Sequence, residues 1–140
     1  MILALIGCAL GLAGAFALGL AQSHTLATTK HFPGLGFAPR NTDYAVVRIG
    51  ASKAQLAPGL TPYRQAVAQH VPLVMLSNAI YDDYDRVNAA GWSRVISTQL
   101  LRGQLGFRGV TITDSLDGAA HARGILPNGL AIGAAKAALL

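Results

Sequence analysis

The chain has 140 residues, which suits one domain with a real core but falls well short of the roughly 250 residues of a complete (β/α)8 barrel. Hydrophobic residues make up 52% of it and charged residues 12%, a composition that excludes overall disorder. The formal net charge is +5, but the eleven lysines and arginines are scattered singly, which argues against a nucleic-acid partner. The single cysteine, Cys8, excludes an intrachain disulfide and a multi-cysteine zinc site.

Residues 1–22 are almost wholly apolar, and their role stays open. The length of the run and the small residues near Ala21 suit a secretory signal or a membrane anchor, although a positively charged start is missing. A lipoprotein site at Cys8 is discounted, because the apolar stretch continues beyond it. The remaining interpretation is a buried helix around Ala13–Leu20. A signal or anchor would place the protein in the envelope or outside the cell, and a buried helix in a bacterial cytoplasm.

The first predicted strand is Thr25–Phe32, a short Thr-rich segment that Pro33-Gly34 ends. Residues 34–60 contain glycines and prolines and have little periodicity, which predicts a long loop. Tyr44–Ile49 is a short extended piece within that loop. Long loops of this kind are usually functional or poorly ordered.

A helix is predicted from Thr61, with threonine as its cap and proline in its first turn, to about His70. The apolar segment Val71–Leu76 is typical of a buried parallel strand. Tyr81–Arg86 is predicted to be an acidic, aromatic loop. Ser93 is placed to cap the next helix.

That helix covers Arg94–Leu105, and Gly106 stops it. The strand Gly109–Thr113 follows. The remaining predicted elements are a helix over residues 115–123, a turn at Pro127-Asn128-Gly129 and a helix over Leu130–Leu140. Helices and strands thus alternate, which predicts an α/β fold with parallel strands joined by crossover helices.

Polar residues follow the ends of two of these strands, where α/β proteins hold their ligands. Asp114 comes directly after a strand and could be a nucleophile, a base or a metal ligand, or it could simply cap the next helix. Lys30 and His31 end the first strand. Because adjacent side chains on a strand point to opposite faces, both can reach one ligand only if the strand ends or bulges there. Otherwise a solvated lysine and a core histidine are expected.

The acidic group Asp82, Asp83 and Asp85 lacks the glycine and the terminal glutamate of an EF-hand loop, so a solvated loop is favoured over a cation site. The chain also lacks a glycine-rich phosphate-binding motif.

Four segments carry a more specific signal. In chain order they are KHFPGLG at Lys30–Gly36, PLVMLSNA at Pro72–Ala79, LLRGQLGFRG at Leu100–Gly109 and TDSL at Thr113–Leu116. Together they resemble the N-terminal barrel domain of glycoside hydrolase family 3. The closest resemblance is to its β-N-acetylhexosaminidase branch, which carries KHFPGHG-type, PLVMxSHA, LLRxxLGFxG and S/T-D-x-L segments in this order.

The resemblance implies a (β/α)8 barrel, of which residues 23–140 would form roughly the second half. It implies hydrolysis of terminal β-linked N-acetylhexosamine or related β-glycosides with retention, on a carbohydrate substrate and without a cofactor. Asp114 would be the nucleophile. Lys30 and His31 would hydrogen-bond the sugar hydroxyls, and such contacts can strengthen in the oxocarbenium-like transition state.

The chain departs from the family pattern at two site positions. Asn41-Thr42-Asp43 stands where the family has Asp-Ser-His, whose histidine is the general acid/base. Asp43 could inherit that role, because a retaining enzyme needs a second protonatable group about 5 Å from the nucleophile. An aspartate is normally ionised at neutral pH, so the role requires burial. Asn78 replaces the usual histidine after Ser77 and can bind a sugar but cannot carry a proton.

The chain is also too short for the whole barrel, and it resembles a fragment that starts near the middle and stops before the last strand. A half-barrel has exposed sheet edges and an open core, so we expect it to be unstable alone or to associate. The alternative to an active glycosidase is therefore a truncated or degenerate, non-catalytic carbohydrate-binding barrel fragment. A membrane partner is expected only if residues 1–22 serve as an anchor.

Overall fold

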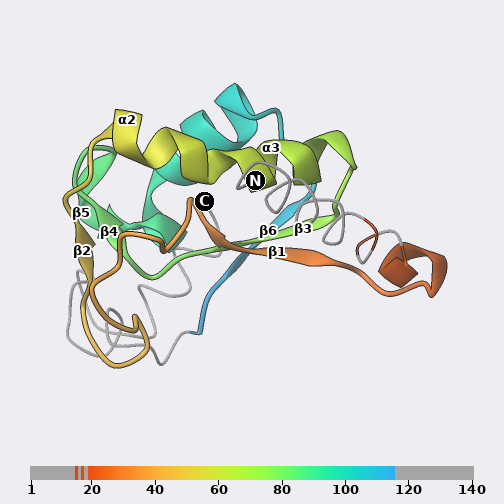
Figure 1. Ribbon diagram of the computed structural model, residues 1–140, viewed down its shortest axis with the longest axis horizontal. Coiled ribbons are helices and arrows are strands. Elements are labelled where there is room, and N and C mark those ends of the chain that lie inside the picture. The colour runs from red at the N-terminus through yellow and green to blue at the C-terminus, as the bar shows by residue number, and fades with distance from the viewer. Residues whose placement is uncertain (1–14, 16, 18, 116–140) are drawn as a thin grey trace, which may run out of the picture.

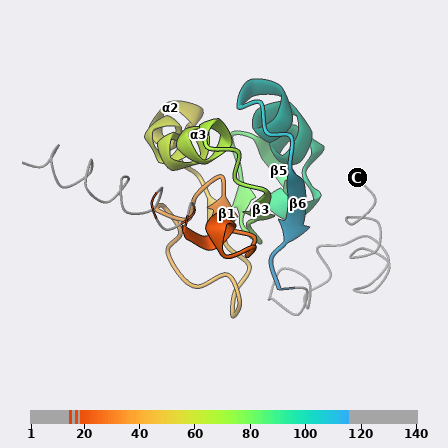
Figure 2. The same ribbon diagram turned by 90° about the vertical axis from the view of Figure 1, so that its right-hand side faces the viewer.

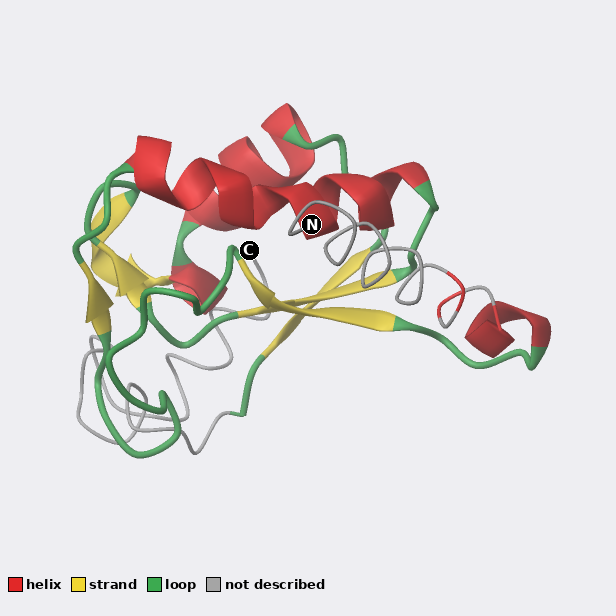
Figure 3. Ribbon diagram, viewed as in Figure 1, coloured by secondary structure: helices red, strands yellow, loops and turns green. Residues whose placement is uncertain are grey.

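The computed structural model describes residue 15, residue 17 and residues 19–115. The strands are β1 (Thr28–Phe32), β2 (Arg48–Ile49), β3 (Leu73–Leu76), β4 (Ile80–Tyr81), β5 (Asp85–Ala89) and β6 (Val110–Thr113). The helical elements are α2 (Lys53–Leu56), η1 (Ala57–Leu60), α3 (Thr61–Ala68), η2 (Ala90–Trp92) and η3 (Val95–Gln104). Figures 1 and 3 show a layer of helices, including α2 and α3, that lies over the strands.

Strands β1, β3 and β6 form a parallel sheet with β3 in the middle. Leu73–Leu76 pairs with Val110–Thr113 in continuous register. On the other side of β3, the register with β1 shifts between Thr29 and Phe32. The predicted parallel sheet is confirmed, and the shift falls at Lys30 and His31, where a bulge was needed for both side chains to reach one ligand.

The predicted loop over residues 34–60 is wrong in its last part, because Ser52 starts a helix. The Ser52 hydroxyl accepts from the Gln55 backbone N–H, and the Gln55 side chain accepts from the Ser52 N–H, a capping box that begins α2. Helix α2 continues through η1 directly into α3. Thr61 therefore lies inside this helical run, and Leu60, not Thr61, precedes α3.

The helix predicted after Ser93 is confirmed, as η3, which has π-helical geometry. The Ser93 hydroxyl accepts from the Ile96 N–H at 3.2 Å, as expected for a cap. Gly106 follows the helix with a φ of 78°, a conformation that favours glycine. Figures 1 and 2 show α2, α3 and η3 on the same face of the parallel sheet.

The acidic, aromatic loop predicted at Tyr81–Arg86 is confirmed only at residues 82–84, which form a turn, because its two ends belong to the strands of a second small sheet. Its order is β2-β4-β5, with β2 parallel and β5 antiparallel to β4. Tyr81 is buried in the core, and the backbone polar groups of buried β4 are satisfied by pairing with its neighbouring strands. Arg48 binds Asp82 at 2.7 Å and donates to the Arg86 carbonyl at 2.7 Å, which joins the outer strands.

The core lies between the helices and the parallel sheet. Phe32 and Tyr63 meet edge to face, with ring centroids 4.9 Å apart, and fix α3 on β1. Burial raises the pKa of Tyr63, with Tyr81 nearby as a smaller cause. Burial also raises the pKa of Tyr81 to about 12, although a hydrogen bond with Ser77 lowers it. Both hydroxyls therefore stay protonated at neutral pH.

The helices predicted beyond Ser115, the turn at residues 127–129 and most of residues 1–22 lie outside the described residues. Residues 19–22 are helical and are exposed or half-buried, and the role of residues 1–22 stays a prediction. Within the part of the chain that the structure describes, no helix has the length and apolar character needed to cross a membrane.

Candidate functional site

The carboxyl ends of the three parallel strands meet at one edge of the sheet. Phe32 is in register with Leu76, and Leu76 with Thr113. The ladder continues one residue further, since Ser77 N–H donates to the Phe32 carbonyl and Asp114 N–H donates to the Leu76 carbonyl. Backbone hydrogen bonds therefore place Asp114 next to the end of β3.

Asp114 and His31 are brought together at this edge from strands 83 positions apart in the chain (114 minus 31). His31 Nε2 lies 3.7 Å from Asp114 Oδ2, and the side chains are 28% and 12% exposed. The other carboxylate oxygen, Oδ1, accepts from the Ser115 N–H at 2.8 Å. The carboxylate is thus oriented with Oδ2 toward the histidine.

These side chains line a cleft of about 740 Å³. Most of its wall is polar, and it collects residues from β1, from the loop that follows β1 and from the end of β6. The lining residues are Lys30, His31, Leu35, Asn41, Thr42, Asp43, Tyr44, Asp114 and Ser115. Four of the five predicted site residues, Lys30, His31, Asp43 and Asp114, share this cleft.

Asp43 reaches the cleft on the loop after β1. Its N–H donates to the Asn41 side chain at 2.8 Å, and the neighbouring Thr42 is only 4% exposed. Asp43 itself is exposed. The burial that the acid/base role requires is therefore not supplied by the described residues, and a bound sugar would have to exclude the water.

The fifth predicted residue, Asn78, is buried rather than on the cleft wall. It is 1% exposed, and its side-chain amide donates to the Ser115 carbonyl at 3.0 Å. This bond ties the end of β3 to the segment that follows Asp114. A sugar contact by Asn78 stays a prediction.

Five residues of the cleft wall had no role predicted from the sequence, namely Leu35, Asn41, Thr42, Tyr44 and Ser115. Ser115 could have been found from its place beside Asp114. Tyr44 had a weaker signal, an aromatic residue in a polar loop directly after Asp43. Nothing in the sequence marked Thr42 as buried.

Asp82, Asp83 and Asp85, the acidic group of the sequence, each accept hydrogen bonds from other residues of the protein. Asp82 pairs with Arg48, Asp83 accepts from the Lys53 N–H at 2.7 Å, and Asp85 accepts from the N–H groups of Val87 and Asn88. Among residue 15, residue 17 and residues 19–115, no group of three histidine, cysteine or acidic side chains is placed to hold a metal ion.

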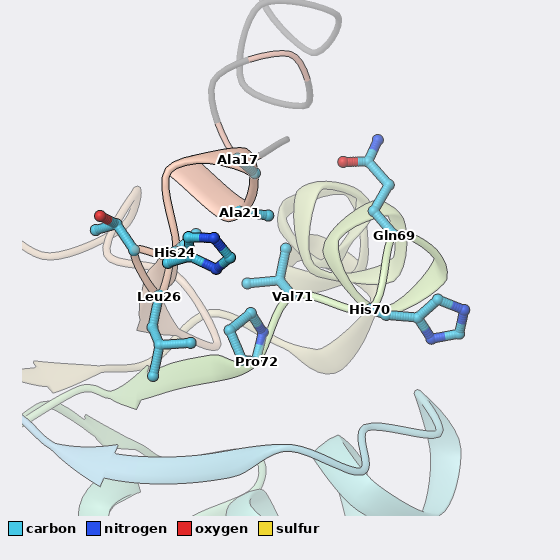
Figure 4. A pocket seen from close by; sticks show the side chains of 10 residues that line it. Ala17, Ala21, His24, Leu26, Gln69, His70, Val71 and Pro72 are labelled. Atoms are coloured by element: carbon cyan, nitrogen blue, oxygen red, sulfur yellow. The ribbon is translucent and has the colours of Figure 1, made fainter. Parts of the chain in front are cut away.

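A second cavity, of about 310 Å³, lies at the opposite, amino-terminal end of the sheet. Residues before β1 and β3 line it, among them Leu26, Val71 and Pro72 (Figure 4). In Figure 4 the His24 ring is directed toward Val71, whereas the His70 ring is directed away. The described wall contains no charged lysine, arginine or carboxylate, so the chemistry is concentrated in the other cleft.

Comparisons with known proteins identify the family. The family model for the glycosyl hydrolase family 3 N-terminal domain matches residues 7–138. An uncharacterized secreted glycosyl hydrolase of Arthroderma benhamiae is 42% identical over 106 residues, 74% of this chain and 30% of that protein. A beta-hexosaminidase of Neisseria gonorrhoeae is 35% identical over 117 residues, 81% of this chain and 32% of that protein.

A solved structure of NagZ from Neisseria gonorrhoeae, in complex with N-trifluoroacetyl-D-glucosamine, is similar with a TM-score of 0.71 and 29% identity. The match covers 85% of this chain and 33% of that one. The chain thus spans about a third of the length of these relatives. Because the family model matches almost the full length of this chain, the chain belongs to glycoside hydrolase family 3.

Proposed function

We propose that this chain carries the nucleophile side of a retaining β-glycosidase that acts on terminal β-linked N-acetylhexosamine. The observation that supports this most is the Asp114–His31 pair at the carboxyl end of a parallel sheet, inside a polar cleft of about 740 Å³. That volume lies in the range of small-molecule sites. Family membership supplies the reaction class.

In the first step, Asp114 Oδ2 attacks the anomeric carbon of the terminal sugar. A carboxylate–sugar ester bond forms as the bond from that carbon to the leaving oxygen breaks. Oδ2 is the attacking oxygen because the Ser115 N–H holds Oδ1. Lys30 and His31 bind sugar hydroxyls beside it and stabilise the transition state more than the ground state.

Asp43 is the proposed proton donor to the leaving oxygen. In the second step its carboxylate takes a proton from water, and the water oxygen attacks the anomeric carbon and releases Asp114. Asp43 lines the same cleft as Asp114, which supports the pairing. The exposed position of Asp43 means that this role depends on the bound sugar to exclude water.

The substrate class rests on the relatives. Beta-hexosaminidase is the name of the Neisseria relative, and the related NagZ structure holds an N-acylated glucosamine. We extend that preference to this chain. We also propose that residues 23–140 form part of a (β/α)8 barrel, and that residues 1–22 are either a signal or anchor or a helix of that barrel.

The test is hydrolysis of a nitrophenyl N-acetyl-β-glucosaminide by the full 140-residue chain and by Asp114→Asn. We expect the substitution to lower turnover by about 10³-fold or more, the scale seen when a nucleophile is removed. Proton NMR of the first-formed sugar should show the β anomer. An α product, or equal turnover by both proteins, would contradict the proposal.

A second candidate, non-catalytic carbohydrate binding, is favoured by one observation, the exposure of Asp43 in place of the family's histidine. It predicts that N-acetylglucosamine binds the chain without any hydrolysis of the aryl glycoside. It also predicts that Asp43→Ala leaves the dissociation constant unchanged. Turnover that depends on Asp114 would exclude this candidate.

A further inference from the structure

We propose that Tyr44 is the platform for the leaving-group sugar, so that the cleft takes a β-linked disaccharide rather than a single sugar. This inference rests on the proposed function, and it adds a residue that determines which substrates bind. It is carried by the exposure of the Tyr44 ring, by its place in the cleft and by its position directly after Asp43.

The Tyr44 side chain is held out into solvent by an anchored loop. It is 81% exposed, yet Thr42 on one side is 4% exposed and Val47 on the other is 1% exposed. The Asn41 side chain closes a turn by accepting from the Asp43 N–H. The backbone beside Tyr44 is therefore anchored and the ring is presented on the wall of the cleft, where little of its apolar surface is covered by the described residues.

The chemistry of the cleft wall distinguishes Tyr44 from its neighbours. Tyr44 supplies the aromatic ring among the described residues that line the cleft, and most of the others are polar. A pyranose has hydroxyls around its edge and C–H groups on its faces. The π face of an aromatic ring carries partial negative charge and attracts such C–H groups while its apolar area is buried.

The position along the chain assigns the ring to the leaving group. Asp43 has to touch the oxygen between the two sugars in order to protonate it. Tyr44 is the next residue, so we place it close to that oxygen, whereas His31 lies 3.7 Å from Asp114 and Lys30 precedes it in β1. The terminal sugar is thus held by the strand residues, and the second sugar stacks on Tyr44.

Phe37 gives a matched control. It is another exposed aromatic residue on the same loop, 52% exposed, and it is not among the described residues that line the cleft. Replacing it removes similar apolar area from the same loop without touching the proposed platform.

The experiment measures dissociation constants for N-acetylglucosamine and for diacetylchitobiose by NMR titration. The full chain is used, in its unaltered form for the monosaccharide alone and in an Asp114→Asn background, which prevents turnover, for both sugars. Tyr44→Ala should weaken disaccharide binding by roughly 2- to 10-fold, the range for one aromatic contact, and leave the monosaccharide within 2-fold. Tyr44→Trp should restore disaccharide affinity, and Phe37→Ala should change neither constant.

Each failure has a separate meaning. If the Asp114→Asn chain binds the monosaccharide but gains no affinity from the second sugar, or if Tyr44→Ala in that background weakens both ligands equally, the platform is overturned and the proposed function stands. If neither the Asp114→Asn chain nor the unaltered chain binds the sugars it is given, the proposed function itself fails and the platform fails with it.

Discussion

The two halves of the candidate site are built in different ways. Lys30, His31 and Asp114 stand at the ends of paired strands, and backbone hydrogen bonds join the residues around them across the sheet. Asn41–Tyr44 belong to a loop whose polar tip is exposed. We call these the strand half and the loop half. The strand half is fixed by the fold itself, whereas the loop half depends on a few local contacts.

The strand half holds the proposed nucleophile, Asp114, and the loop half holds the proposed proton donor, Asp43. A nucleophile must sit within a few tenths of an ångström of its working position, and a paired strand supplies that rigidity. A proton donor needs an environment that excludes water, which a loop gains when the ligand binds. Changes to the buried side chains that support the strand half should therefore cost stability, and changes in the loop half should cost activity alone.

The largest effect is expected on turnover, in the loop half. Asp43→Ala should lower turnover of a poor-leaving-group glycoside by about 10²- to 10⁴-fold, because the leaving oxygen loses its acid. The free energy of unfolding should stay within about 0.5 kcal/mol, since the side chain is exposed. Steady-state rates and urea unfolding check both parts. A substrate with a very good leaving group should be affected far less, and equal losses on both substrates would contradict the role.

The next largest effect is on stability, in the strand half. Phe32→Ala should lower the free energy of unfolding by about 3–5 kcal/mol, because a fully buried ring leaves a cavity beside Tyr63. Urea unfolding measures this. Phe37→Ala, on the exposed loop, is the control and should stay within about 0.5 kcal/mol. Similar losses for both variants would remove the distinction between the halves.

A smaller effect is expected at Gly109, just before β6. A Cβ there would collide with the Pro72 carbonyl and lie 2.7 Å from Phe107 Cζ, so Gly109→Ala should cost about 1–3 kcal/mol. The clash should also shift the start of the strand that ends at Asp114. Gly36→Ala in the loop is the matched control, because its Cβ meets no atom within 4 Å. Thermal unfolding of both variants decides the matter, and a stable Gly109→Ala protein would refute the packing argument.

The smallest effect concerns the small sheet, in which β2 anchors the far end of the loop half. Burial alone would raise the pKa of Asp85, but hydrogen bonds from Asn88, Ser93 and Val87 outweigh it and hold the pKa below its ordinary value of 3.8. A lowered folded pKa contributes stability above the unfolded value and loses it as pH falls through the folded value. Asp85→Asn should therefore destabilise the protein at neutral pH, by up to about 1 kcal/mol.

The same Asp85→Asn variant should approach the parent protein in stability as the pH falls below 3.8. Urea unfolding at neutral and acidic pH measures the difference between the two proteins. A difference that is independent of pH would show that the charge of Asp85 plays no part.

The strand half could be predicted from sequence because its signals are local. A Thr-rich segment that Pro33-Gly34 ends, and a short strand segment followed by Asp114, mark strand ends, and parallel strands bring their carboxyl ends together. The family resemblance then attached roles to those ends. The alternation of side chains along a strand made an end or a bulge at Lys30 and His31 the condition for both to reach one ligand, and the register shift meets that condition.

The rest depended on contacts between distant segments. The small sheet needs Tyr81 in the core, with its hydroxyl donating to the Gly34 carbonyl 47 residues away, and no local pattern reveals that pairing. Ser52 and Gln55 have the spacing of a capping box, which predicts a helix start, but the weak periodicity of residues 34–60 favoured a loop there. Asn78 was expected to face the sugar, but burial and the Ser115 contact are tertiary properties.

The most direct test of the account is to trap the sugar on the enzyme. The full chain is incubated with a fluorinated N-acetylglucosaminyl donor that forms the covalent intermediate quickly and hydrolyses it slowly, and the peptides are analysed by mass spectrometry. The account predicts one added sugar on the peptide that contains Asp114, and none in Asp114→Asn. An adduct on a different carboxylate, or turnover of substrate with no trapped adduct, would contradict it.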